Sequence, residues 1–469
     1  MTRTRFLVLG LLVLAVAVIA VVGLRNKARL VAMMHRATYV APPPARPLTA
    51  AEDRRRLMDL LHIKALRPGV DGRNPHAPNA ANYDEARANP YRVLPDLLKT
   101  VDGKTVDKAE DWWRVQRPAI ADDFEREVYG QLQTLILLPQ WKTVDTVPET
   151  VGAQQGITRH LVFHVADQAD ARRFVDMKLT ITLPAKGTGP FPVILQLASG
   201  KLKPPPGMPP STWREQVLAK GWGTAVLDVD SVQPDNGADL VRGIIGIASH
   251  GKPRGPADWG VLRVWAWGAS RVMDYFESDA TINAQQVGIE GHSRYGKAAL
   301  IAMAYDSRFS VAFISSSGAG GAALLRRNFG ERLENLAGVG EYHWFAGNFL
   351  KYAGPQTAND LPVDAHGLIA MCAPRPVFIG AGSKGDMWVD ARGMFLAEVA
   401  AGAVYRLLGA RDLGTTTMPP VGTALLSGDL AFRQHEDGHT PEPNWPSFLE
   451  FASRYLHVGG KQVLPHPHG

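Results

Sequence analysis

The sequence predicts an α/β protein in which helices flank both faces of a mostly parallel sheet, and three observations predict it. Residues 259–277 place apolar side chains at helical spacing, as an amphipathic helix between two strands does. Residues 157–164 and 174–183 alternate apolar and polar side chains, which is typical of antiparallel edge strands. Short, nearly continuous apolar runs, typical of buried parallel strands, occur at 191–197, 222–229, 286–290, 309–315 and 376–381. Strands that alternate with helices indicate a three-layer arrangement.

The N-terminal end of the chain has the composition of a membrane-spanning segment. Residues 6–24 are uncharged and mostly apolar, and as a helix they would span about 28 Å, close to the hydrocarbon thickness of a bilayer. Because no clear small-residue cleavage site follows, an uncleaved signal anchor is expected, with a cleaved signal as the alternative. More Arg and Lys residues follow this segment than precede it, which favours a cytoplasmic C-terminal flank. That bias conflicts with export of the protein and leaves the orientation open.

The chain is expected to divide into three regions. Residues 1–40 hold the anchor and its basic flank, and residues 41–110 hold a proline-rich linker followed by an irregular extension. Residues 111–469 form the α/β domain. At the start of the extension, residues 50–66 have the pattern of a short amphipathic helix.

Composition argues against several classes of partner. The net charge of +6 arises in residues 1–50, which hold seven basic residues and no acidic one. The rest of the chain is close to neutral, so a nucleic-acid partner is not expected. The single cysteine, Cys372, allows no intramolecular disulfide, and its apolar surroundings are typical of a buried residue. We expect a monomer without a cofactor.

A serine stands at a predicted strand-to-helix turn, in the sequence Gly291-His292-Ser293-Arg294-Tyr295-Gly296-Lys297. A serine at such a turn presents its hydroxyl at the top of the sheet, as in the nucleophile elbow of α/β-hydrolases. The usual spacing is Gly-x-Ser-x-Gly, whereas the second glycine here comes one residue late, at Gly296. Ser293 is therefore the candidate nucleophile, and a helix-capping serine in an ordinary turn is the alternative.

A serine nucleophile needs a base within hydrogen-bond reach and an acid that orients the base. In α/β-hydrolases the acid lies between the serine and the histidine in the chain. The loop after the predicted strand 376–381 offers Asp386 as this acid, with Asp390 as the fallback. Either carboxylate could instead be a solvated loop residue or a helix cap.

The base is expected in the loop before a predicted C-terminal helix at residues 445–455. His439 lies in this loop and is the preferred base, with His435 as the runner-up. A metal site on this i, i+4 histidine pair would need a helix, which Gly438 disfavours, so no metal is expected.

With these residues in order, the chain resembles carbohydrate esterase family 15, the glucuronoyl esterases. The elbow is similar to that family's Gly-x-Ser-Arg-x-Gly-Lys pattern, including the late glycine. The resemblance extends over roughly residues 80–456. Further stretches that resemble bacterial members are Asn82-Tyr83-Asp84-Glu85-Ala86, Trp265-Ala266-Trp267-Gly268-Ala269-Ser270-Arg271, His343-Trp344-Phe345, Leu361-Pro362-Val363-Asp364-Ala365-His366 and Ala373-Pro374-Arg375-Pro376-Val377.

The resemblance implies an α/β-hydrolase fold and cleavage of the ester between (4-O-methyl-)glucuronic acid of glucuronoxylan and an alcohol of lignin. It gives Arg294 the task of helping to hold the oxyanion. It implies that Lys297, Glu341 and Trp388 bind the sugar. Such a substrate places the protein at the periplasmic or extracellular face, tethered by residues 6–24 or secreted if they are cleaved.

One departure from the family pattern bears on the acid. Many members take it from a Glu just after the strand that follows the elbow, and Ser316 occupies that position here. Because a serine side chain cannot act as the triad acid, the loop after the predicted strand 376–381 must supply it, which favours Asp386.

Two other functions stay open. An acetyl-xylan esterase or another carbohydrate deacetylase would place the sugar on the alcohol side of the ester. A membrane-tethered carbohydrate-binding protein without catalysis would be expected to have an incomplete triad.

Overall fold

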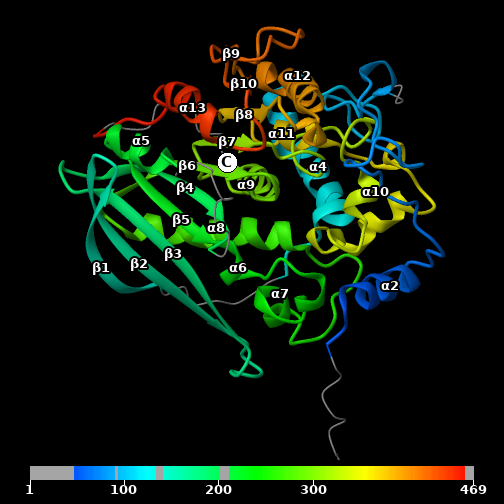
Figure 1. Ribbon diagram of the computed structural model, residues 1–469, viewed down its shortest axis with the longest axis horizontal. Helices are drawn as coiled ribbons and strands as arrows, with labels where there is room; N and C mark the ends of the chain where they lie inside the picture. The colour runs from blue at the N-terminus through cyan, green and yellow to red at the C-terminus, as the bar shows by residue number, and fades with distance from the viewer. Residues whose placement is uncertain (1–46, 90–92, 134–140, 201–210, 460–469) are drawn as a thin grey trace, which may run out of the picture. The chain divides into compact units, whose positions relative to one another are not determined.

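A ten-stranded sheet organises the computed structural model, which describes residues 47–89, 93–133, 141–200 and 211–459 (Figure 1). The strand order is β1-β2-β3-β5-β4-β6-β7-β8-β10-β9. The strands are β1 Trp141–Val151, β2 Gln154–Ala166, β3 Phe174–Pro184, β4 Phe191–Ala198, β5 Gly223–Asp228, β6 Ile282–His292, β7 Val311–Ser315, β8 Val377–Gly382, β9 Ala424–Leu425 and β10 Leu430–His435.

The centre of the sheet is parallel and its edges are antiparallel. Strands β5, β4, β6, β7, β8 and β10 pair in parallel with one another, in that order. The long strands β1, β2 and β3 pair antiparallel and extend from one side of the sheet (Figure 1). The predictions of a mostly parallel sheet and of antiparallel edge strands are therefore confirmed.

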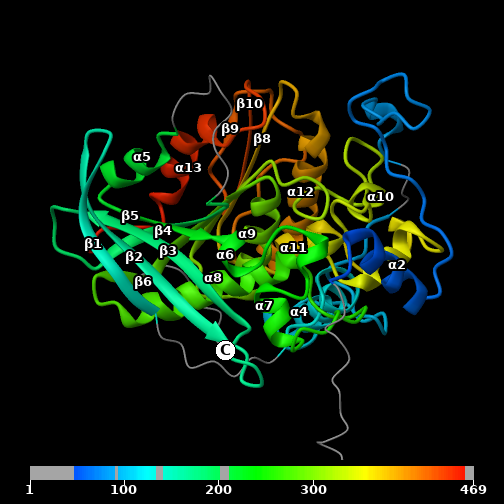
Figure 2. The ribbon, with the colours of Figure 1, turned by 60° about the horizontal axis from the view of Figure 1, so that its bottom comes forward.

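Helices cover both faces of the sheet (Figure 2). The α-helices are α2 Ala50–Leu60, α3 Ala109–Asp111, α4 Arg117–Phe124, α5 Trp213–Ala219, α6 Val229–Val232, α7 Gly243–Ala248, α8 Val261–Ser278, α9 Arg294–Tyr305, α10 Leu333–Leu336, α11 Ala365–Ala370, α12 Ala391–Leu407 and α13 Trp445–Ala452. Helices α5 and α13 pack one face around Trp213 and Trp445, whose rings stack 5.1 Å apart. Helices α8, α9, α11 and α12 bury the larger core on the other face.

The helix predicted over residues 50–66 ends earlier, at Leu60. It begins with a capping box in which Thr49 and Glu52 satisfy each other's backbone N–H groups. In the described part of the chain, the structure has no helix that is both long and apolar enough to cross a bilayer. The predicted anchor at residues 6–24 lies outside the described residues.

Residues 67–89 of the predicted irregular extension run beside α10 and the loop that precedes it (Figures 1 and 2), and from here on the name extension refers to these residues alone. Asn335 of α10 donates from Nδ2 to the Val70 carbonyl over 2.8 Å. The loop ahead of α10 is bound twice, because the Gly330 N–H donates to the Asn82 carbonyl and the Asn328 N–H to the Ala88 carbonyl. The extension thus helps to fix the position of residues 328–331.

Candidate active site

Ser293 lies between the end of β6 and the start of α9, in a strained backbone conformation. Its φ of 59° and ψ of −127° are rare for a residue with a side chain. The Ser293 N–H donates to the Ser315 carbonyl of β7 over 2.8 Å, which holds the turn against the sheet. This is the conformation of a nucleophile elbow.

Steric contacts explain why the second glycine of the elbow stands at residue 296 rather than 295. A Cβ on Gly296 would lie 2.8 Å from the Gly291 carbonyl oxygen and 2.9 Å from that of Ser315, so no side chain fits there. At residue 295, where the usual motif has glycine, a side chain fits, and the Tyr295 ring lies 5.5 Å from the ring of Trp265 on α8. The close approach between α9 and the two strands therefore falls at Gly296.

His439 lies in the loop after β10 and pairs with Asp386 from the loop after β8. The His439 Nδ1–H donates to Asp386 Oδ1 over 2.6 Å. Asp386 Oδ2 accepts from Ser316 Oγ over 2.7 Å and from the Gly382 N–H over 2.8 Å. Although burial favours the neutral acid, these hydrogen bonds and the His439 charge lower the pKa of Asp386.

The two fallback residues make other contacts. Asp390 caps the N-terminus of α12 by accepting from the Gly393 N–H, and it pairs with the buried Arg327 over 2.6 Å. His435 is buried and its Nε2 bonds to the Thr440 carbonyl over 2.9 Å. The structure thus brings Asp386 and His439 together, whereas Asp390 and His435 have other partners.

His292 connects the histidine loop to the elbow. Its ring centroid lies 4.3 Å from that of His439, and it directly precedes Ser293 in the chain. Burial and the neighbouring His439 lower the pKa of His292 to about 3, so His292 is neutral. No hydrogen bond joins the Ser293 hydroxyl to His439; bonds between a nucleophile and its base often form only when substrate binds.

Arg294 begins α9 and is held by a partly buried carboxylate that the sequence did not single out. Its Nη1 donates to Asp235 Oδ2 over 2.7 Å, and its guanidinium carbon lies 4.9 Å from the Trp344 ring centroid. Asp235 Oδ1 accepts from Trp344 Nε1 over 2.6 Å and from His343 Nε2 over 2.8 Å. Against the effect of burial, these donors lower the pKa of Asp235 to about 2. The Arg294 backbone N–H, in the first turn of α9, has no partner within the helix.

Lys297, one helical turn after Ser293, is buried rather than solvated. Its Nζ donates to Glu331 Oε2 over 2.8 Å. The other oxygen of Glu331 accepts from Trp388 Nε1 over 3.3 Å. Glu331 therefore joins two predicted sugar-binding residues, and sequence reasoning missed it because no local motif surrounds it.

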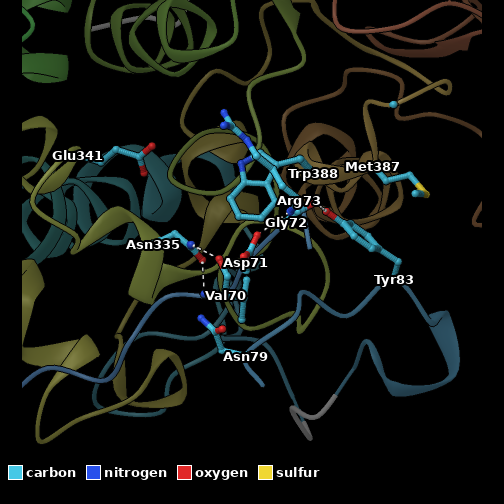
Figure 3. Close-up of a pocket in the computed structure, with 11 residues that line it drawn as sticks. Val70, Asp71, Gly72, Arg73, Asn79, Tyr83, Asn335, Glu341, Met387 and Trp388 are labelled. Carbon is cyan, nitrogen blue, oxygen red and sulfur yellow. Dashed lines mark hydrogen bonds between the residues drawn. The ribbon is translucent and has the colours of Figure 1, made fainter. Parts of the chain in front are cut away.

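Glu341 lies close to this cluster without a hydrogen bond to Lys297 or Trp388. Its Oε2 is buried and has no hydrogen-bond partner among the described residues. Burial and the nearby negative charge of Glu331 raise the pKa of Glu341 to about 7. Together with Trp388 it lines a pocket of about 760 Å³ (Figure 3).

Asp235 could have been found from its position. It follows β5, whose apolar run the sequence shows, and side chains at the carboxyl ends of parallel strands gather at one edge of the sheet. Among the described residues, no group of three or more His, Cys, Asp or Glu side chains has the geometry to hold a metal ion.

Comparison with known proteins places the chain in a family. A family model described as glucuronyl esterase, fungi, matches residues 254–409. A protein named as a carbohydrate esterase, from an unknown prokaryotic organism, is 32% identical over 430 residues, which cover 82% of this chain and 94% of the relative. A 4-O-methyl-glucuronoyl methylesterase of Hypocrea jecorina is 29% identical over 251 residues, which cover 52% of this chain and 50% of that protein.

A solved structure agrees with these relatives. The family 15 glucuronoyl esterase of Teredinibacter turnerae is 45% identical and superimposes with a TM-score of 0.82, covering 87% of this chain and 99% of that one. The chain therefore belongs to carbohydrate esterase family 15, the glucuronoyl esterases.

Proposed function

We propose that this enzyme is a 4-O-methyl-glucuronoyl methylesterase that cleaves esters between (4-O-methyl-)glucuronic acid of glucuronoxylan and lignin alcohols. The observation that carries the mechanism is the Asp386–His439 pair at 2.6 Å beside the strained Ser293 turn. This order and geometry match the requirements of a serine hydrolase, in which an acid orients the histidine and the histidine activates the serine.

Acylation begins when Ser293 Oγ attacks the uronate carbonyl carbon and His439 Nε2 accepts the hydroxyl proton. The carbonyl oxygen gains a negative charge, which the Arg294 guanidinium and its backbone N–H stabilise. Asp386 keeps Nδ1 of His439 protonated and stabilises the imidazolium. The tetrahedral adduct then expels the alcohol, which takes the proton from His439, and an ester on Ser293 remains.

Deacylation repeats these steps with water. His439 accepts a proton from the attacking water, and the second tetrahedral adduct collapses by expelling Ser293 Oγ. The serine regains its proton from His439, and the uronic acid leaves as a carboxylate. No redox step or external co-reactant besides water is needed.

The Lys297–Glu331–Trp388 cluster is the proposed uronate site. It begins one helical turn after the nucleophile, so a sugar bound there has its C6 ester close to Ser293. Lys297 supplies donors and Glu331 supplies acceptors for ring hydroxyls, while the Trp388 indole offers an aromatic face. Glu341 is a further candidate for hydroxyl binding, through its unpartnered Oε2.

Hydrolysis of benzyl glucuronate tests the proposal, with 4-nitrophenyl acetate as the comparison. We expect the wild type to cleave the glucuronate ester and Ser293→Ala to lose this activity. An enzyme that hydrolysed acetate esters but not benzyl glucuronate would instead be a deacetylase, and failure on both substrates would refute the esterase mechanism.

We also propose that the enzyme works outside the cytoplasm, because its polymeric substrate cannot cross a membrane. Protease protection of intact cells tests this: an accessible enzyme supports the proposal, and protection until lysis contradicts it.

A further inference from the structure

One indole, that of Trp344, faces two cations of the candidate active site. The guanidinium carbon of Arg294 lies 4.9 Å from the Trp344 ring centroid, and the Lys297 Nζ lies 5.7 Å from it. Both distances are within the roughly 6 Å over which the negative face of an aromatic ring attracts a cation. Trp344 is only 3% exposed, so water covers almost none of its surface. The ring therefore contacts the proposed oxyanion-binding residue and a proposed uronate-binding residue at once.

The two cations stand one helical turn apart. Arg294 and Lys297 occupy positions i and i+3 of α9, where side chains are neighbours and like charges repel. Each cation has a carboxylate of its own, because Asp235 accepts from Arg294 over 2.7 Å and Glu331 accepts from Lys297 over 2.8 Å. The face of the Trp344 ring contacts both cations and so joins these two ion pairs.

The polar edge of Trp344 reaches the partner of Arg294 as well. The Trp344 Nε1–H donates to Asp235 Oδ1 over 2.6 Å, while Oδ2 of the same carboxylate holds Arg294. His343 Nε2 lies 2.8 Å from Asp235 Oδ1, and because the ionised carboxylate can only accept, the shared hydrogen is on Nε2. Trp344 thus contacts Arg294 directly through its face and indirectly through Asp235.

The segment that carries Trp344 is fixed by a buried arginine and by helix α8. The Arg254 guanidinium donates from Nη1 to the Phe345 carbonyl over 2.5 Å and from Nη2 to the Tyr342 carbonyl over 3.4 Å. At the N-terminus of α8, a Cβ on Gly260 would lie 2.2 Å from the Trp344 carbonyl oxygen, so the two backbones are in direct contact. The Trp344 side chain therefore projects toward α9 from a well-supported backbone.

We propose that Trp344 is a positioning residue that sets Arg294 and Lys297 relative to each other, so that one substrate can engage both. The inference rests on the proposed function, because that function gives Arg294 the carbonyl oxygen and Lys297 the sugar hydroxyls. A uronate ester uses both cations, since its carbonyl and its ring hydroxyls belong to the same acyl group. An acyl group without hydroxyls uses Arg294 alone. Trp344 therefore favours uronate esters without touching the substrate.

Steady-state kinetics on benzyl glucuronate separate the two effects, because kcat reports oxyanion stabilisation and KM includes sugar binding. Trp344→Leu removes both the aromatic face and the Nε1–H donor, and we expect it to lower kcat about tenfold and to raise KM about tenfold. Trp344→Phe keeps an aromatic face but loses the donor to Asp235. It should lower kcat about fivefold and leave KM within about twofold of the wild type.

Binding without turnover gives an independent measure of the sugar contact. In the Ser293→Ala background, isothermal titration calorimetry with methyl glucuronate should give a Kd that rises about tenfold with Trp344→Leu and stays within about twofold with Trp344→Phe.

Trp267→Leu is the matched control for the loss of a buried indole. The Trp267 side chain is 6% exposed, and its ring also faces an arginine, with the Arg271 guanidinium carbon 5.4 Å from the ring centroid. Its ring packs against Trp259 and not against Arg294 or Lys297. We expect this control to lower the melting temperature but to keep kcat, KM and Kd within about twofold of the wild type.

Three results would overturn the inference. In the first, Trp344→Leu changes neither KM nor the Kd of methyl glucuronate. In the second, Trp344→Phe leaves kcat unchanged. In the third, Trp267→Leu reproduces the losses of Trp344→Leu, which would assign them to packing in general. If circular dichroism shows that Trp344→Leu is unfolded, Trp344→Phe decides: a lower kcat at an unchanged KM supports the inference, and an unchanged kcat overturns it. Wild-type cleavage of benzyl glucuronate separates these outcomes from failure of the proposed function.

Discussion

Replacing Asp386 by Asn tests the assignment of the acid most directly. The change keeps the size of the side chain but removes the charge that keeps Nδ1 of His439 protonated and orients the ring. Loss of this function in serine hydrolases lowers kcat by about 10⁴, which corresponds to about 5.5 kcal/mol of transition-state stabilisation. We expect a loss of this size for benzyl glucuronate, measured at saturating substrate.

Asp390→Asn is the matched control, because it makes the same chemical change four residues later. Asp390 pairs with Arg327, which is fully buried, and caps α12, so its loss should lower the melting temperature. Its kcat should stay within about tenfold of the wild type, since Asp390 does not contact His439. The reasoning would be refuted if Asp386→Asn kept most of its activity while Asp390→Asn lost it.

Ser316 offers a rescue experiment for the same prediction. Its Oγ lies 2.7 Å from Asp386 Oδ2, at the position where many family members have Glu. In the Asp386→Asn background, Ser316→Glu should recover at least about tenfold in kcat, because Ser316 already contacts the side chain that bonds to His439. Ser316→Ala in the wild type, which removes a single donor to Asp386, should reduce kcat by less than about tenfold.

Three further predictions concern other acidic side chains. Glu331→Gln should lower kcat/KM for benzyl glucuronate by about 10- to 100-fold, mainly through KM, because Lys297 loses its charged partner; steady-state kinetics check this. Asp235→Asn should lower kcat in the wild type but have no further effect in the Arg294→Ala variant, because we expect Asp235 to act by holding Arg294. A double-mutant cycle measures this coupling, and an equally large effect of Asp235→Asn in the Arg294→Ala variant would contradict the prediction. Burial raises the pKa of Glu290 to about 8 from an ordinary 4.5. The native state therefore loses stability as the pH rises from 4.5 to 8, because the unfolded chain releases this proton first. Glu290→Gln should raise the melting temperature at pH 8 but not at pH 4.

The fold could be predicted because its strands are distinctive. Five continuous apolar runs each became a parallel strand, and the alternating segments 157–164 and 174–183 became β2 and β3. Strand β1 was not predicted because it lacks an alternating pattern. Of its eleven residues, seven in succession, beginning at Lys142, are exposed. A strand was expected before the histidine loop, but β10 could not be given bounds because its six residues end in polar side chains.

The site could be predicted only where chain order carries information. Ser293, Asp386 and His439 follow a known order along the chain, and the structure places Asp386 against His439. Glu331 contacts Lys297 from a loop that no local pattern marks, whereas Asp235 is marked only by its place after β5. The catalytic and binding roles of all five remain predictions until the variants are measured.

The contacts of the extension also bear on the order in which the protein is completed. Asn82 and Glu85 lie 246 and 242 residues before their partners Asn328 and Arg327. At a synthesis rate of about 5–20 residues per second, roughly 10–50 seconds therefore pass between the synthesis of the extension and the synthesis of the residues that bind it. The pocket that the extension lines therefore cannot form before Trp388 has been synthesised, and a nick in the extension should abolish the pocket while the central sheet stays folded.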